Sequence, residues 1–324
     1  MPEGAGRRST ADGPRRPGEW CPACGGELAR WREVPAGEPS EHRRYALLRC
    51  GECGTAVTGG DPPGPGAYEA GVYAPCTPRA LPLVRALQRA TVAQVTRILR
   101  RTGLPPGARV LDAGAGTGRL VEALARSGYA ASGIEPSARS SAIAAAAGRP
   151  VRREGIESHR EEGLDAVILW HVLEHLDAPG AALESVHRWL APGGLLLVGV
   201  PNIESSQARI GGAGWLHLDA PRHRTHFSPR GLELLLGAGG FEALRTHHLV
   251  WEHNPAGMWM ALLARAGMTP GLPFHLLKRN AVPTPRDMAL LVAGVPLAPM
   301  AVALEAVAAA AGRGGTLAAV ARRR

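Results

Sequence analysis

Residues 109–120 read RVLDAGAGTGRL, an apolar strand that ends in Asp112 and runs into a glycine-rich turn. Gly114, Gly116 and Gly118 permit a tight turn and the close approach of a ligand, because no Cβ stands in the way. The helix predicted to follow presents unpaired N–H groups at its first turn, which favours a nucleotide-like ligand. The spacing is GxGxG and not the GxGxxG of dinucleotide sites, so a pyrophosphate is not the expected ligand.

A second apolar segment, residues 129–134, ends in Glu135. A carboxylate after the second strand of such a unit is placed to accept hydrogen bonds from ribose hydroxyls. A GxGxG turn alone is also consistent with a simple helix cap. Glu135 follows the next strand at the corresponding position, which favours a ligand site instead.

Three further stretches complete a pattern: HVLEHL at residues 171–176, APGG at residues 191–194 and VPN at residues 200–202. Together with the glycine turn and Glu135, they resemble the class I S-adenosylmethionine-dependent methyltransferases over most of residues 68–324. The resemblance implies that S-adenosylmethionine is the cofactor and that its parts are held as follows: the methionine end by Asp112, Gly114, Gly116 and Gly118 and bordered by His171, the ribose by Glu135, and the adenine by the backbone near Gly155 and Ile156.

The order of predicted elements agrees with that family. The expected strands cover residues 108–113, 129–134, 150–154, 164–170, 194–200, 241–251 and 315–321, and the expected helices cover residues 81–102, 117–127, 136–147, 178–190 and 228–239. Alternating strands and helices imply a parallel α/β sheet with helices on both faces and a ligand site at the carboxyl ends of the strands. The resemblance implies a Rossmann-like sheet of seven strands whose last strand is antiparallel.

Two CxxC pairs stand near the N-terminus, Cys21 with Cys24 and Cys50 with Cys53, and a glycine follows each pair. Four thiolates at this spacing predict one tetrahedral Zn²⁺, and four cysteines leave no open coordination position. We therefore expect a structural zinc ribbon. Disulfides are not favoured, because no secretory signal precedes the cysteines.

These signals divide the chain into four parts. We expect a disordered tail over residues 1–20, the zinc ribbon over residues 21–57, a linker with an N-terminal helix over residues 58–107, and the methyltransferase domain over residues 108–324. In the resembled family, the segment with Tyr68 and Tyr73 folds back on the cofactor pocket. Cys76 is left over and is interpreted as a small apolar residue.

The 324 residues are 45% hydrophobic, which suffices for a globular core, and the net charge is +9. Lys278 is the sole lysine among 37 basic residues, so the charge reflects an arginine-rich composition and is weak evidence for nucleic-acid binding. Residues 79–109 contain seven arginines and no acid. That stretch is interpreted as a solvated helix face or as a contact with an anionic substrate or membrane.

Residues 254–313 form a predicted helical insertion before the last strand. Within it, residues 288–311 are apolar except for Glu305, and their length would allow a membrane span. The chain must return to place residues 315–321 in the sheet, so a single crossing is excluded. Buried packing, a contact in a homodimer or peripheral membrane attachment remain.

Methyl transfer from a sulfonium depends mostly on alignment in a dry site, and a base is needed only for a poorly nucleophilic acceptor. His171 and His175 are candidates for that base. The PRHRTHF stretch at residues 221–227 adds His223 and His226, which we predict to face the substrate as the catalytic pair. Each histidine could equally brace a loop.

The sequence thus predicts a cytoplasmic enzyme, with peripheral attachment to the inner face of the membrane through residues 288–311 as one of the alternatives. It would transfer a methyl group to oxygen or carbon of a small-molecule acceptor, such as a sugar nucleotide, a natural product or an envelope intermediate. One alternative is an RNA methyltransferase, although no base-flipping motif is seen. Another is a non-catalytic scaffold with this fold at a membrane or protein surface.

Overall fold

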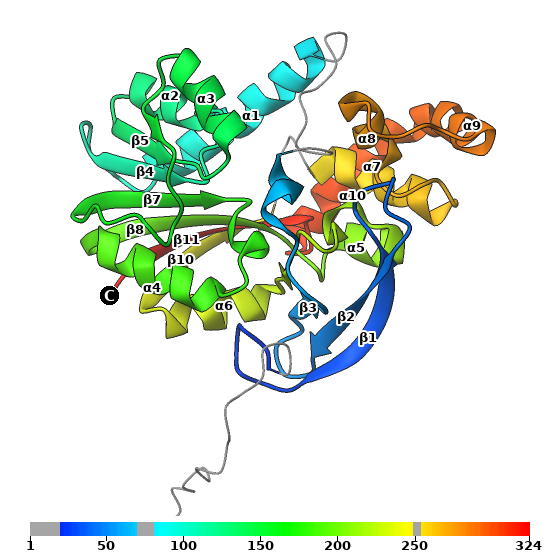
Figure 1. Cartoon of the computed structure of the whole chain (residues 1–324), viewed down its shortest axis with the longest axis horizontal. Coiled ribbons are helices and arrows are strands. Elements are labelled where there is room, and N and C mark those ends of the chain that lie inside the picture. Colours follow the sequence, from blue (N-terminus) through cyan, green and yellow to red (C-terminus); the bar gives the residue numbers. More distant parts are fainter. Residues whose placement is uncertain (1–19, 70–80, 249–253) are drawn as a thin grey trace, which may run out of the picture.

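The computed structural model describes residues 20–69, 81–248 and 254–324, and Figure 1 shows their arrangement. Two sheets organise this part of the chain, one of seven strands and one of four. The expectations for residues 1–19, Tyr73, Cys76 and residues 249–251 lie outside the described residues.

The larger sheet has the strand order β10-β11-β8-β7-β4-β5-β6. Its strands are β4 (Arg109–Ala113), β5 (Ala130–Ile134), β6 (Val151–Arg152), β7 (Leu164–Trp170), β8 (Leu190–Pro201), β10 (Phe241–His247) and β11 (Thr316–Arg323). The strands from β4 to β8 run parallel, and β11 is antiparallel to both β8 and β10. This confirms the predicted seven-stranded sheet with an antiparallel last strand. The strand β6 is shorter than the predicted residues 150–154.

Helices cover both faces of this sheet, as Figure 1 shows. The first face packs against α1 (Leu81–Arg100) and α2 (Arg119–Arg126), and the second against α4 (Pro179–Trp189) and α6 (Pro229–Ala238). Successive strand residues point to opposite faces, so Val110 packs with α1 and α2 while Leu111 packs in the other core. The helix α3 (Ala138–Ala146) contacts β6.

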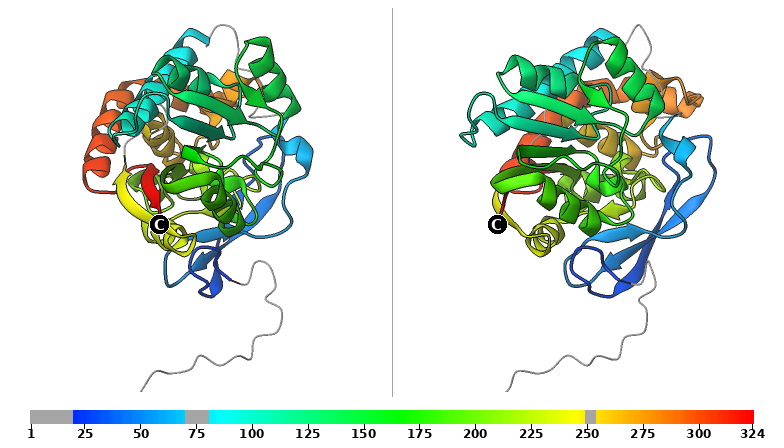
Figure 2. Two further views of the ribbon diagram at one scale, coloured as in Figure 1. Left: turned by 90° about the vertical axis from the view of Figure 1, so that its left-hand side faces the viewer. Right: turned by 60° about the vertical axis from the view of Figure 1, so that its left-hand side comes forward.

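The smaller sheet contains β1 (Leu28–Pro35), β2 (Arg44–Cys50) and β3 (Ala56–Thr58) of the predicted ribbon. Its fourth strand is β9 (Thr225–His226), which comes from the methyltransferase domain and pairs with β3. The predicted ribbon, residues 21–57, does not include this strand. Figure 2 shows the blue ribbon strands lying along the larger domain, to which this sheet is joined.

The insertion consists of helices, as predicted: α7 (Asn254–Arg265), α8 (Leu272–Lys278), α9 (Pro285–Gly294), the 3-10 turn η6 (Val295–Leu297) and α10 (Ala298–Ala310). The helix α7 packs on α10 and on α5 (Ser206–Gly211). Buried Glu305 fixes α10 by accepting from Asn254 Nδ2 (2.8 Å), Gly315 N (2.7 Å) and Gln207 Nε2 (3.1 Å). Burial raises the pKa of Glu305 to about 7.

The stretch Pro285–Ala310 is long and apolar enough to cross a membrane by length and composition, and 17% of its most apolar window is buried. Val292 and Val307 are each 69% exposed, and Val295 is 61% exposed. Packing inside this chain buries Ala301, Glu305 and Ala308 but leaves most of residues 288–311 exposed. The dimer contact and the membrane attachment stay predictions.

Candidate cofactor cavity and metal centre

A cavity of about 730 Å³ opens at the carboxyl ends of β4, β5 and β7. Six of the eight residues predicted to hold the cofactor line it: Gly114, Gly116, Glu135, Gly155, Ile156 and His171. Parallel strands bring their carboxyl ends to one edge of the sheet, so residues far apart in the sequence meet there. Asp112 and Gly118, the other two predicted residues, are not among the residues that line it.

The three glycines of the turn have different roles. All have positive φ, at +85° for Gly114, +53° for Gly116 and +74° for Gly118. A Cβ on Gly114 would lie 2.3 Å from the side chain of Val172, and one on Gly118 would lie 2.9 Å from that of Val151. A Cβ on Gly116 would meet no protein atom within 4 Å. Gly116 thus leaves space for a ligand, while the other two glycines permit close packing of the protein.

Glu135 is fixed by the backbone that surrounds the turn. Its Oε2 accepts from the N–H of Gly116 and its Oε1 accepts from the N–H of Ser137, both at 2.8 Å. Each carboxylate oxygen keeps a second lone pair, which can accept from a ribose hydroxyl. Burial raises the pKa of Glu135 in spite of these two hydrogen bonds.

Asp112 is the penultimate residue of β4, just before the glycine turn, and is 3% exposed. Burial, and then the nearby charge of Glu135, raise the pKa of Asp112 to about 7. A cationic ligand group in the cavity would favour its ionised form. The methionine part of S-adenosylmethionine carries such a group, so this carboxyl fits the predicted cofactor.

His171 follows β7 with a positive φ of 54°, a conformation that is uncommon for residues other than glycine. Its Nδ1 shares a hydrogen bond with Oε1 of Glu174 at 2.9 Å. His175, at the end of the 3-10 turn η3 (Leu173–His175), also lines the cavity. Both candidate bases after β7 therefore border the ligand space.

Further residues, not predicted from the sequence, also line the cavity. Gly66 and Glu69 lie in and after the 3-10 turn η1 (Pro65–Tyr68), and Oε1 of Glu69 accepts from the N–H of Ala138 at 3.0 Å. The segment with Tyr68 does therefore fold back on the pocket, as the resemblance implied. Tyr68 marked this segment in the sequence, but the residue that lines the cavity is Glu69, which follows it.

The predicted catalytic pair, His223 and His226, is buried at 8% and 4% exposure. Among the described residues, the cavity walls include neither of them. Burial lowers the pKa of His223 well below its usual value and that of His226 to about 3, so both are neutral at physiological pH. Their catalytic role stays a prediction.

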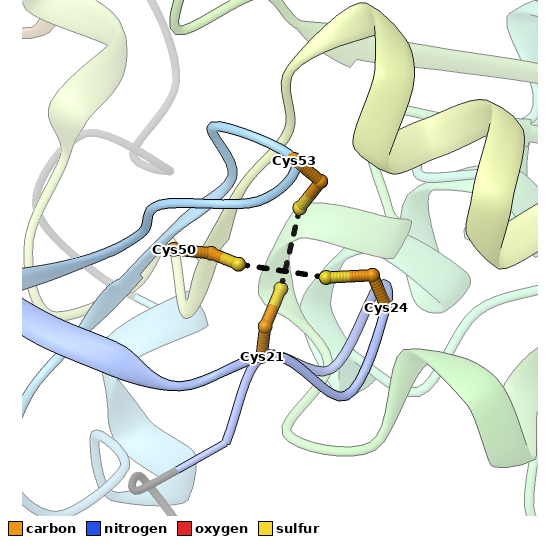
Figure 3. Close-up of side chains that lie close together, drawn as sticks. All are labelled: Cys21, Cys24, Cys50 and Cys53. Atoms are coloured by element: carbon orange, nitrogen blue, oxygen red, sulfur yellow. Dashed lines mark hydrogen bonds between the residues drawn. The ribbon is translucent and has the colours of Figure 1, made fainter. Parts of the chain in front are cut away.

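The four cysteines come together as predicted, and Figure 3 shows their sulfur atoms converging on one point. The distance from Cys21 Sγ to Cys53 Sγ is 3.5 Å, as is that from Cys24 Sγ to Cys50 Sγ. All four sulfur atoms lie within 4.8 Å of one another. Thiolates converging in this way fit a tetrahedral Zn²⁺.

Burial raises the pKa of Cys21, and raises that of Cys24 to about 11. Without a cation these two thiols would stay largely protonated, whereas hydrogen bonds from the backbone of Cys53 and Glu52 outweigh burial and lower the pKa of Cys50. A metal ion would stabilise the thiolates. The knuckles also join the main core, because Ser228 Oγ donates to the carbonyl of Cys53. Arg49 of β2 pairs with Glu204 at 2.8 Å.

Comparison with known families agrees with this geometry. The family described as a methyltransferase domain matches residues 84–246, half of the chain, and the protein belongs to that family. Its sheet, glycine turn and acid after β5 are those of the class I S-adenosylmethionine-dependent methyltransferases.

The similar proteins include two named ubiquinone biosynthesis O-methyltransferases. The one from Caulobacter sp. (strain K31) is 32% identical over 30% of this chain and 42% of its own length. The one from Azorhizobium caulinodans is 31% identical over 45% of this chain and 63% of its own length. The chain therefore spans about half the length of these relatives.

Among solved structures, the [4+2]-cyclase SpnF is 23% identical, with a TM-score of 0.46 over 71% of this chain and 80% of that one.

Proposed function

We propose that the protein transfers the methyl group of S-adenosylmethionine to an oxygen or carbon atom of a small-molecule acceptor. The observation that carries this proposal is the cavity wall formed by Gly116 and Glu135, with buried Asp112 close enough to Glu135 for their charges to interact. The glycine leaves room for a ligand, Glu135 offers lone pairs to a ribose, and Asp112 attracts a cationic group. The cofactor would supply an electrophilic methyl sulfonium there.

The acceptor class is supported by relatives and by the surface. The curated relatives are named as O-methyltransferases of ubiquinone biosynthesis, and ubiquinone is a small molecule. A sugar nucleotide, a natural product or an envelope intermediate remains within this class. An RNA acceptor is less favoured, because the basic surface of α1 carries arginines without interleaved aromatic residues.

Calorimetry with S-adenosylmethionine and its demethylated product tests the cofactor assignment first. We expect one site per chain, and no heat of binding would refute the enzyme and support the scaffold alternative. Incubation with labelled cofactor and fractionated small molecules then tests the acceptor. A salt-dependent RNA gel shift together with label in RNA would favour the RNA methyltransferase.

We also propose a cytoplasmic location with peripheral attachment to the membrane through residues 288–311. The exposed side chains of this stretch are apolar, and its charged member, Glu305, is buried. Exposed Arg279 and Arg286 precede the stretch and exposed Arg313 follows it. An apolar surface flanked by cations fits the interface of a membrane that contains anionic lipids.

Flotation with vesicles of phosphatidylcholine and phosphatidylglycerol tests this attachment. We expect the wild type to float and the double variant V292D/V307D to remain in solution. The control is Ile143→Asp, which places one aspartate at an exposed apolar side chain of α3 and should still float. A wild type that stays in solution with every vesicle refutes the attachment. A dimer that the double variant disrupts would then support the homodimer contact.

A further inference from the structure

A second group of potential metal ligands lies beside the cofactor cavity. Glu174 and His175 belong to η3, and His223 belongs to the loop that leads into β9. One ligand atom from each side chain lies within 4.8 Å of the other two. The N–H of Arg224 donates to the carbonyl of Glu174 at 2.7 Å, which holds the two segments together.

Both histidines of this group are held in the tautomer that a metal site needs. Nδ1 of His175 is 3.1 Å from the carbonyl oxygen of Arg222, and Nδ1 of His223 is 2.8 Å from that of His217. A carbonyl oxygen can only accept, so each Nδ1 carries the proton and each Nε2 carries the lone pair. Metal-bound histidines are typically oriented in this way, by a backbone carbonyl on the other nitrogen.

Glu174 provides an independent observation. The residue is 1% exposed, and its Oε1 is engaged by His171. Its Oε2 is buried and has no hydrogen-bond partner within the described ranges. A buried carboxylate oxygen without a donor is costly, and a cation bound between the three side chains would remove that cost.

We propose that Glu174, His175 and His223 bind one divalent transition-metal ion. Two imidazoles and one carboxylate suit ions such as Zn²⁺, Fe²⁺ and Co²⁺ better than Ca²⁺ or Mg²⁺, which prefer oxygen ligands. Three protein ligands leave at least one coordination position open. The site therefore differs in kind from the closed set of four cysteines.

A fourth ligand could reach such an ion from the cofactor cavity, because His175 also lines that cavity. This step rests on the proposed methyl transfer: an oxygen atom of the acceptor, from a hydroxyl or a carbonyl, would take the open position. Coordination would orient that oxygen and lower the pKa of a hydroxyl.

Neighbouring polar groups are engaged elsewhere. Asp219 pairs with Arg222, and its Oδ2 is 3.9 Å from Nε2 of His223. Nε2 of His226 lies 2.9 Å from Oγ1 of Thr58. His226 is thus a buried histidine close to the group but outside it, which makes it a matched control.

Cobalt titration of the demetallated full chain tests the proposal. We expect two equivalents to bind, one with the strong charge-transfer bands of thiolate ligands and one with only the weak bands of nitrogen and oxygen ligands. His223→Ala should bind only the thiolate equivalent. Glu174→Gln, which keeps the shape of the side chain, should weaken the second equivalent by at least about 10-fold.

The control variant His226→Ala should retain both equivalents, and the thiolate bands report in each variant that the ribbon is folded. Binding of a single equivalent by the wild type, or an unchanged second equivalent in both His223→Ala and Glu174→Gln, overturns the proposal. Metal counting needs no turnover, so it separates the two proposals. If the chain binds S-adenosylmethionine but only one equivalent of cobalt, the metal site is refuted and the proposed methyl transfer is not.

Discussion

Oγ1 of Thr58, in the ribbon sheet, lies 2.6 Å from the carbonyl oxygen of His223 and 2.9 Å from Nε2 of His226. The hydroxyl has one proton and donates it to the carbonyl, so it must accept from Nε2–H of His226. The lone pair of His226 is therefore on Nδ1, whereas those of His175 and His223 are on Nε2. A residue of the small sheet thus sets the tautomer of a predicted catalytic histidine.

The first prediction concerns this threonine. Thr58→Val keeps the shape of the buried side chain but leaves the His223 carbonyl and the His226 N–H without their partner. We expect the free energy of unfolding to fall by about 1–3 kcal/mol, measured by urea denaturation. Thr102→Val, at a half-buried hydroxyl that bonds only to a carbonyl at the end of α1, should cost less than about 1 kcal/mol. Equal losses in the two variants would contradict the role assigned to Thr58.

The second prediction concerns loss of the predicted zinc ion from the four cysteines. Because β9 completes the ribbon sheet, loss of the metal should release the histidine segment as well as the knuckles. Cys53→Ser should lower the Tm and increase amide hydrogen exchange at residues 225–228. Proteolysis confined to residues 21–58, with unchanged exchange at 225–228, would show that the ribbon unfolds alone.

The third prediction uses two glycines with similar backbones. Gly116 and Gly107 have φ of +53° and +79°, and a Cβ on either would meet no protein atom within 4 Å. Alanine at either position should cost about 1–2 kcal/mol of stability, from backbone strain. Gly116→Ala should in addition weaken binding of S-adenosylmethionine by at least about 10-fold, since its methyl group takes ligand space. Equal cofactor affinity in both variants would show that the cofactor does not bind against Gly116.

The fourth prediction concerns pH. The pKa of Asp112 is raised to about 7, so the carboxyl is mostly neutral below that pH and ionises as the pH rises through it. A cationic amino group binds the ionised form more tightly, so cofactor affinity should increase from about pH 5.5 to about pH 7.5, by at most tenfold per unit. Asp112→Asn should bind more weakly and show a flatter profile. Calorimetry across this range checks the slope, and a wild-type affinity independent of pH would contradict it.

Much of the cofactor cavity could be predicted from local sequence. Glycines with positive φ, a strand that ends in an acid and a second acid after the next strand are each visible within a few residues. The fixed geometry of parallel strands then brings Gly116 and Glu135 together. The CxxC pairs were equally readable, because a shared metal requires that spacing.

Contacts between distant segments could not be read in this way. Nothing in the residues around Thr225 and His226 indicates pairing with β3, because two residues carry no periodic pattern. Likewise, no local pattern around Trp215 indicates its partners, yet it is 2% exposed and packs with Val34 and Leu47 of the ribbon. The apolar composition of residues 288–311 suggested burial, yet composition cannot distinguish a covered helix from an exposed one.

The pairing of β3 with β9 has a consequence for synthesis on the ribosome. The cysteine knuckles and the first three strands of the small sheet emerge early, and they can take up their ion while most of the chain is still untranslated. The outer edge of β3 then keeps unsatisfied backbone groups until residues 225 and 226 leave the exit tunnel. During that interval the nascent chain presents an open strand edge to any neighbouring polypeptide, so timely arrival of β9 protects it from mispairing.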